Sequence, residues 1–173
     1  MGIETEAAGP VFLRRISAGD RDEFIALAKA SEGLHHPWVY VPTTVEGFAE
    51  YLARFDGITA VGFLVCVRND VAGFVSISRI ERSSYERGVL GYGAFVPHAG
   101  CGYMTEGVGL AVRHGFERLG LHRLEADIQP ENAASLQLAR RVGMRREGFS
   151  PGLIRIAGVW RDHERWAIVR DRV

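Results

Sequence analysis

Runs of apolar residues bounded by polar turns predict seven strands in this sequence. They cover residues 11–16, 59–68, 71–80, 88–96, 123–128, 153–156 and 159–169. The second and third runs are joined by Asn69-Asp70, a two-residue turn that tolerates positive φ, so together they predict a hairpin. In the fifth run polar and apolar residues alternate, and Leu124, Ala126 and Ile128 face one way, which is typical of a strand with one buried face.

Apolar residues at helical spacing predict four helices and leave residues 32–43 as a loop. The helices cover residues 21–31, 44–55, 105–119 and 133–142. Asp20, Thr44 and Asn132 stand where the side chains of N-caps are expected. The order is a strand, two helices, three strands, a helix, a strand, a helix and two strands. This order predicts an α/β (α+β) fold with a central sheet and helices on both faces.

A short glycine turn, Gly100-Cys101-Gly102, lies between the strand 88–96 and the helix 105–119. The first N–H groups of a helix have no partner within the helix, and the helix dipole adds partial positive charge there. Glycines let an anion approach the backbone closely, so this arrangement predicts a bound pyrophosphate. The alternative is a plain strand-to-helix connection whose glycines serve only the turn.

Length and composition fit one globular domain. The chain has 173 residues, of which 47% are hydrophobic and 24% charged. The small, polar residues 1–10 are expected to be disordered, and residues 11–173 to form the domain. No apolar run approaches the roughly 20 residues that span a bilayer, and no signal peptide is visible.

Charge and cysteine content exclude some classes of binding partner and of metal site. Lys+Arg and Asp+Glu both number 21, so neither nucleic acid nor an anionic membrane is an expected partner. The two cysteines, Cys66 and Cys101, lack the spacing of a metal site and need no disulfide. A cytoplasmic protein without a bound metal is therefore expected.

The order of elements and five motifs resemble the GNAT superfamily of acetyl-CoA-dependent N-acetyltransferases, and within it the RimJ/RimL type that acetylates the N-termini of ribosomal proteins. The motifs are Gly100-Cys101-Gly102-Tyr103-Met104-Thr105-Glu106, Leu121-His122-Arg123-Leu124-Glu125-Ala126, Asn132-Ala133-Ala134-Ser135, Gly143-Met144-Arg145-Arg146-Glu147-Gly148 and Trp160-Arg161-Asp162-His163. The family's phosphate loop is usually Arg/Gln-x-x-Gly-x-Gly/Ala. Here Ala99 and Met104 occupy its first and last positions, and Gly102 alone keeps to the pattern.

The resemblance implies a mixed, mostly antiparallel seven-stranded sheet that is splayed between its fourth and fifth strands, with acetyl-CoA bound in the gap. It implies that the backbone N–H groups of the loop hold the pyrophosphate. These belong to Gly100, Cys101, Gly102, Tyr103, Met104 and Thr105. The strand end Phe95-Val96 would pair with the amide groups of pantetheine, as an added strand does. Asn132 would contact the pantetheine arm, although it could equally serve as a helix cap.

Acetyl transfer to an amine needs a neutral amine, a polarised thioester and a proton for the leaving thiolate. By resemblance, Ser135 is the proton donor, and its alternative role is packing at a helix start. The base is open between Asp127, Tyr92 and His36, and a water chain is a further alternative. For Asp127 the role of a solvated or ion-paired strand residue is favoured. Asp162-His163 adjoin on a strand, so their side chains should point to opposite faces.

The amine that accepts the acetyl group is the component of the reaction that the sequence defines least. His35, His36 and Trp38 in the loop 32–43 suggest a substrate lid, and the alternative is a loop pinned by its aromatic residues. The loop has no acidic run to attract a polycation, which favours a peptide or protein α-amine over an antibiotic or polyamine. A non-catalytic acyl-CoA-binding module is the alternative from another class. A homodimer is left open, and a nicotinamide-binding domain is disfavoured because G-x-G-x-x-G is missing.

Overall fold

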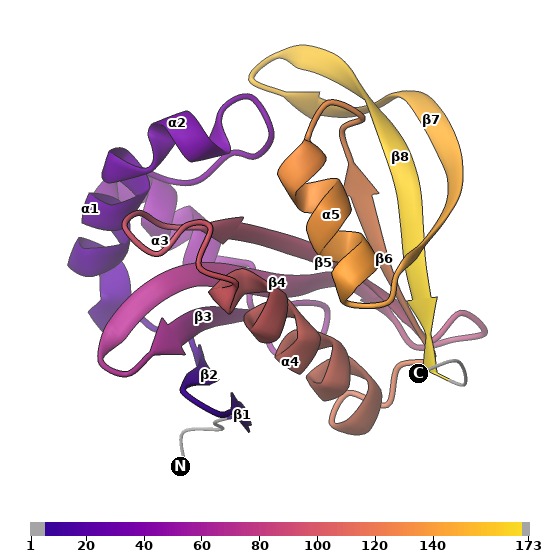
Figure 1. Cartoon of the computed structure of the whole chain (residues 1–173), viewed down its shortest axis with the longest axis horizontal. Helices are drawn as coiled ribbons and strands as arrows, with labels where there is room; N and C mark the ends of the chain where they lie inside the picture. Colours follow the sequence, from indigo (N-terminus) through magenta and orange to yellow (C-terminus); the bar gives the residue numbers. More distant parts are fainter. Residues whose placement is uncertain (1–5, 171–173) are drawn as a thin grey trace.

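A computed structural model describes residues 6–170 (Figure 1). The strands of this part of the chain form one eight-stranded sheet in the order β1-β2-β3-β4-β5-β6-β8-β7. They are β1 (Glu6–Ala8), β2 (Val11–Arg15), β3 (Val61–Val67), β4 (Asp70–Glu81), β5 (Arg87–Ala94), β6 (Arg123–Ile128), β7 (Arg145–Ile156) and β8 (Val159–Val169). All neighbours are antiparallel except the parallel pair β5–β6.

The seven predicted strands are all present, and the mixed, mostly antiparallel sheet is confirmed. The additional strand is β1, which pairs with β2 through Glu6–Ala8. The prediction that residues 1–10 are disordered is therefore wrong for Glu6–Ala8, and residues 1–5 lie outside the described part. The sequence places too few apolar residues there to signal a strand.

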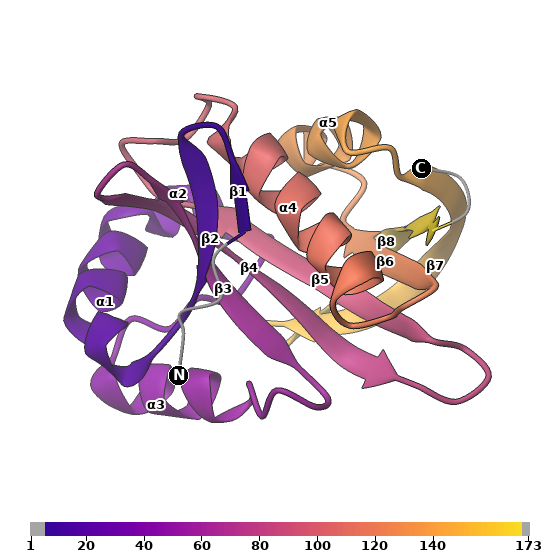
Figure 2. The same cartoon turned by 90° about the horizontal axis from the view of Figure 1, so that it is seen from below.

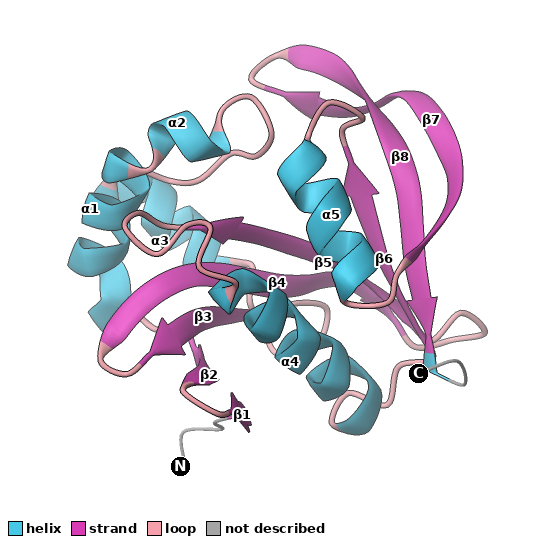
Figure 3. Cartoon of the chain, in the orientation of Figure 1, coloured by secondary structure: helices cyan, strands magenta, loops and turns pink. Residues whose placement is uncertain are grey.

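Five α-helices and one 3₁₀ turn accompany the sheet among the described residues (Figure 3). They are the turn η1 (Ala18–Asp20) and the helices α1 (Arg21–Ala30), α2 (Glu32–His35), α3 (Val45–Ala53), α4 (Tyr103–Glu117) and α5 (Ala133–Arg141). The expected loop 32–43 thus begins with a short helix, α2, because this turn carries His35 inward against Phe74 and Phe95. No helix of the described part is long and apolar enough to cross a bilayer.

The helices cover both faces of the sheet, as predicted (Figure 1, Figure 2). On one face α1 and α3 enclose an aromatic core that includes Phe24, Phe48 and Phe74. On the other face α4 and α5 pack on strand residues such as Val65 and Ile77. Successive residues of β3 therefore alternate between two cores, which explains why the whole strand is buried.

Local signals account for the helix starts. Thr44 Oγ1 accepts the N–H of Gly47 at 3.1 Å, and Asn132 Oδ1 accepts the N–H of Ser135 at 3.2 Å, so both predicted caps are confirmed. Asp20 is different, because its carboxylate makes no cap bond to α1. It accepts the backbone N–H of Ser17 at 2.7 Å and pairs with Arg14 at 2.7 Å.

The splay predicted between the fourth and fifth strands lies between β5 and β6. The two strands pair only at their beginnings, where Arg87 to Val89 run beside Arg123 to Glu125. Beyond Val89 they diverge, and the gap between them opens toward α5 and the loop after α2 (Figure 1). This gap positions the site.

Candidate active site

A cavity of about 540 Å³ occupies the gap between β5 and β6. Its walls come from α2 and the loop after it, the second half of β5, the glycine turn, the end of β6, and α5. Segments from both halves of the chain therefore meet around one space. The splay creates this space because two parallel strands separate before either one ends.

The glycine turn presents unpaired backbone donors at one end of the cavity. Gly100 and Gly102 have φ values of 79° and 86°, and an added Cβ at either would meet no atom within 4 Å. Cys101 N–H already donates to His98 O, and Thr105 N–H to Gly102 O. Among the described residues, no acceptor takes the N–H groups of Gly100, Gly102, Tyr103 and Met104.

These four N–H groups stand at the start of α4, a 15-residue helix whose dipole favours an anion. The turn therefore fits the diphosphate of a nucleotide-type ligand. The side chains contribute less. Ala99 and Met104 line the cavity, while the Cys101 side chain is exposed and neither it nor Tyr103 is part of the lining.

Met104 fits because of a glycine on a neighbouring strand. Its sulfur occupies the space that a Cβ on Gly73 would fill. The bulk that departs from the usual loop pattern is thus directed toward β4.

The part of β5 that faces the cavity lies before the predicted pair Phe95-Val96 in the sequence. Gly91, Tyr92, Gly93 and Ala94 line the cavity, whereas Phe95 and Val96 do not. Phe95 is 0% exposed and its N–H donates to Ala72 O at 2.8 Å.

Val96 is also engaged away from the cavity, because its N–H donates to Ser31 Oγ at 3.1 Å. The backbone N–H groups of the predicted pair Phe95-Val96 therefore already have protein acceptors, at Ala72 and at Ser31 between α1 and α2. The strand segment that lines the cavity is the preceding one, from Gly91 to Ala94, in which the Ala94 carbonyl already accepts a hydrogen bond from His35.

Two predicted catalytic residues meet across the gap. Tyr92 on β5 and Ser135 on α5 both line the cavity, and their hydroxyl oxygens are 2.8 Å apart. Burial raises the pKa of the Tyr92 hydroxyl, and the bond to Ser135 opposes this only in part. Tyr92 therefore keeps its proton and can donate it to Ser135 Oγ, which leaves the Ser135 hydrogen free to point into the cavity.

Asp127 is held as an ion pair. Its side chain is 9% exposed, and its Oδ1 lies 2.9 Å from Arg165 Nε on β8. It is also the one carboxylate among the described residues that line the cavity. Of the two structural alternatives for Asp127, solvated or ion-paired, the geometry has the ion pair, and the side chain also lines the cavity. Asp162 and His163 point to opposite faces as predicted, one exposed and one buried.

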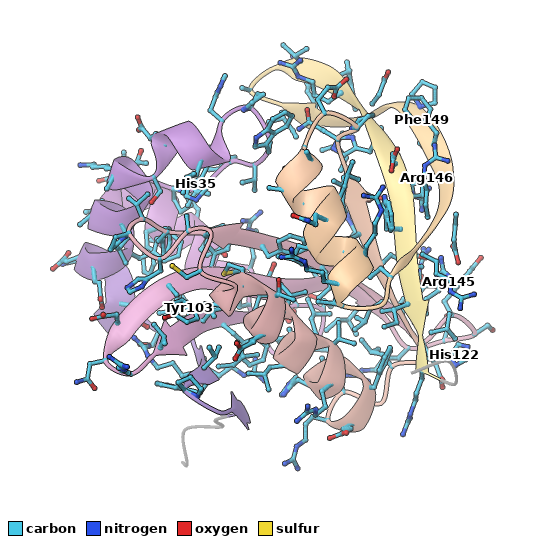
Figure 4. The ribbon with its side chains drawn as sticks, viewed as in Figure 1. His35, Tyr103, His122, Arg145, Arg146 and Phe149 are labelled. Atoms are coloured by element: carbon cyan, nitrogen blue, oxygen red, sulfur yellow. The ribbon has the colours of Figure 1, made fainter. Side chains whose placement is uncertain are left out.

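The expected lid is pinned rather than free. His35 is 5% exposed, and its Nε2–H donates to Ala94 O at 2.8 Å (Figure 4). Burial lowers the pKa of the His35 imidazole, and the bond to Ala94 opposes this. Trp38 lines the cavity, but His36 is exposed and does not.

One residue of this site carried no signal in the sequence. Gln129 directly follows β6, lines the cavity and holds the loop after α2 through the carbonyls of Pro37 and Trp38. In the sequence, Gln129 is distinguished only as a polar residue that directly follows a strand. Arg145, Arg146 and Phe149, in contrast, project from β7 at the right edge of the view and do not line the cavity (Figure 4).

Comparisons with known proteins agree with this geometry. The family model described as an acetyltransferase (GNAT) domain matches residues 11–145. Probable N-acetyltransferase YjcK of Bacillus subtilis is 30% identical over 169 residues, which cover 92% of this chain and 93% of the relative. The ribosomal protein uS5-alanine N-acetyltransferase of Escherichia coli is 32% identical over 94 residues, 54% of this chain and 48% of that protein.

The fold also matches a solved structure. Mycobacterium smegmatis RimJ in complex with CoA-disulfide superposes with a TM-score of 0.86 at 23% identity. The superposition covers 99% of this chain and 87% of the other.

Proposed function

The chain belongs to the GNAT family of acetyltransferases, and from this membership we propose that it acetylates the α-amine of a protein or peptide N-terminus. Membership makes it an acetyl-CoA-dependent N-acetyltransferase. The observation that carries the proposal is the cavity in the splay, which is lined both by the glycine turn with its unpaired backbone donors and by Asp127. Acetyl-CoA supplies the activated acyl group, and the chain's own residues bind, orient and move protons.

The cofactor side rests on backbone groups. The N–H groups of Gly100, Gly102, Tyr103 and Met104 hold the pyrophosphate, and the edge from Gly91 to Ala94 pairs with the pantetheine amides. This edge takes the place of the expected pair Phe95-Val96. Asn132 keeps its cap through Oδ1, so a contact with pantetheine would come from its amide nitrogen.

The catalytic roles are assigned to the three polar side chains Ser135, Tyr92 and Asp127, all of which line the cavity. Ser135 protonates the departing sulfur, and Tyr92 fixes the orientation of the Ser135 hydroxyl. Asp127 takes the proton that the attacking amine loses. Arg165 Nε lies 2.9 Å from Asp127 Oδ1 and orients this carboxylate.

Charge favours a peptide amine over a polyamine. Asp127 is the one carboxylate among the described lining residues, and Arg165 already balances it. A polyamine would need further acidic groups for its other ammonium centres. The E. coli relative, named for alanine of a ribosomal protein, supports an N-terminal acceptor.

The test is an acceptor screen with acetyl-CoA. Thiol release would be followed with an N-terminal alanine peptide, the same peptide with a blocked α-amine, and spermidine, with mass spectrometry to locate the acetyl group. Acetylation of the free α-amine alone is expected. Acetylation of spermidine alone would replace the proposal with a polyamine acceptor. CoA binding without turnover of any amine would favour a non-catalytic binding module.

A further inference from the structure

The Gln129 carboxamide joins the two walls of the cavity. The residue is 5% exposed and lines the cavity just beyond the end of β6. Its Nε2 donates to the carbonyls of Pro37 and Trp38, each at 3.2 Å. Both partners are pure acceptors, so the nitrogen must face them and the orientation of the amide is fixed.

The oxygen of the same carboxamide has no protein partner. Among the described residues, no N–H or O–H group donates to Gln129 Oε1. A carboxamide oxygen without a protein partner takes its donor from water or from a ligand. Since Gln129 is part of the cavity wall, that donor can come from a molecule bound in the cavity.

Asp127 lies two residues before Gln129, and both line the same cavity. Two acceptors are therefore placed in sequence along one wall, with Cα atoms roughly 6.6 Å apart at strand spacing. An extended peptide N-terminus offers two donors in the same order, first the α-amine and then the backbone N–H of its second residue. A simple alkylamine offers only the first.

On the basis of the proposed function, we propose that Gln129 Oε1 accepts the backbone N–H of the acceptor's second residue while the α-amine lies at Asp127. Gln129 is thus a specificity-determining residue that selects an N-terminal peptide unit over an isolated amine. Its nitrogen holds the loop of Pro37 and Trp38 in place at the same time. A bound acceptor and this loop are therefore linked through one side chain.

The experiment compares two peptides that differ in one group. The first begins with two alanines, and in the second a lactic acid residue replaces the second alanine, so an ester oxygen replaces the N–H. Wild-type protein should show about a tenfold higher kcat/KM for the amide peptide. In Gln129→Leu the ratio should fall to about one, because Oε1 is gone.

Gln137→Leu is the matched control. Gln137 is an exposed carboxamide on α5 that also borders the cavity, and its loss should leave the wild-type ratio unchanged. Equal kcat/KM values for both peptides with the wild-type protein would overturn the inference even if Gln129→Leu did not fold. An unchanged ratio in a folded Gln129→Leu would overturn it as well. Acetylation of neither peptide would overturn the proposed function itself, which is a distinguishable result.

Discussion

Replacing Ser135 with alanine should lower kcat by about 100-fold, because a positioned general acid contributes roughly 10² to 10⁴ in rate. Replacing Tyr92 with phenylalanine should lower kcat by about five- to tenfold, the value of one neutral hydrogen bond. The difference follows from the 2.8 Å contact, in which Tyr92 orients Ser135 and Ser135 faces the cavity. The KM for acetyl-CoA should stay within about twofold, since neither hydroxyl belongs to the glycine turn.

The double variant separates this relay from two independent effects. If Tyr92 acts through Ser135, its loss has no further effect once Ser135 is alanine, so the double variant should match Ser135→Ala. Since burial raises the pKa of Tyr92 above its ordinary value of 10.0, the wild-type rate should show no alkaline loss from this group below that pH.

The assay is steady-state thiol release between pH 6 and 10, with thermal unfolding to check that each variant is folded. A Ser135→Ala protein with kcat within threefold of wild type would remove Ser135 from the mechanism. Multiplying losses in the double variant would show that Tyr92 acts on its own, and the relay would be abandoned.

Three further predictions concern the base, the turn and the lid. Asp127→Asn should lower kcat about 100-fold at pH 7 and recover part of this at higher pH, where the amine is already neutral; a pH profile parallel to wild type would exclude Asp127 as the base. Gly100→Ala and Gly102→Ala each place a side chain at positive φ, at a cost of roughly 1–2 kcal/mol. Titration calorimetry should show about tenfold weaker CoA binding for each variant, with little change in kcat. Burial lowers the folded-state pKa of His35 below 6.5, so below that pH the unfolded chain binds more protons and the free energy of unfolding should fall as pH drops. Urea unfolding at pH 5 and pH 7 should give a smaller difference in this free energy for His35→Gln, because glutamine cannot titrate.

Apolar patterning was sufficient for the strands and helices that carry a core, and insufficient where a strand is exposed on both faces. The first half of β7 was missed because Arg145, Arg146 and Glu147 are all exposed. Its strand conformation comes from pairing with β8 instead, including Arg145 with Ala167. A four-residue helix such as α2 is also too short to show a period.

The site was predictable where a local motif carries it. The glycine turn, Asn132 and Ser135 each sit at a helix start, which the sequence marks directly. The contact between Tyr92 and Ser135 depends on how far β5 and β6 diverge, a distance that no local pattern contains.

Two other positions depended on contacts from distant parts of the chain. The surroundings of Phe95 could not be read from the sequence, because an apolar strand end can face either a ligand or a core. Here the contacts with Phe24 and Phe74 place it in the core. Gln129 was missed because its partners, Pro37 and Trp38, lie far away in the sequence.

Met104 shows how a departure from a family pattern can leave the backbone donors of a loop unpaired. The usual small residue at this position keeps the turn close to its anion, and a methionine there would be expected to disturb it. The structure removes the conflict at Gly73, where a Cβ would overlap the Met104 sulfur and would also lie 2.5 Å from Gly93 O. Because the space comes from another strand, the N–H groups of the turn remain unpaired and accessible. Binding competence in such a loop is therefore better judged from its free backbone donors than from the letters of its motif.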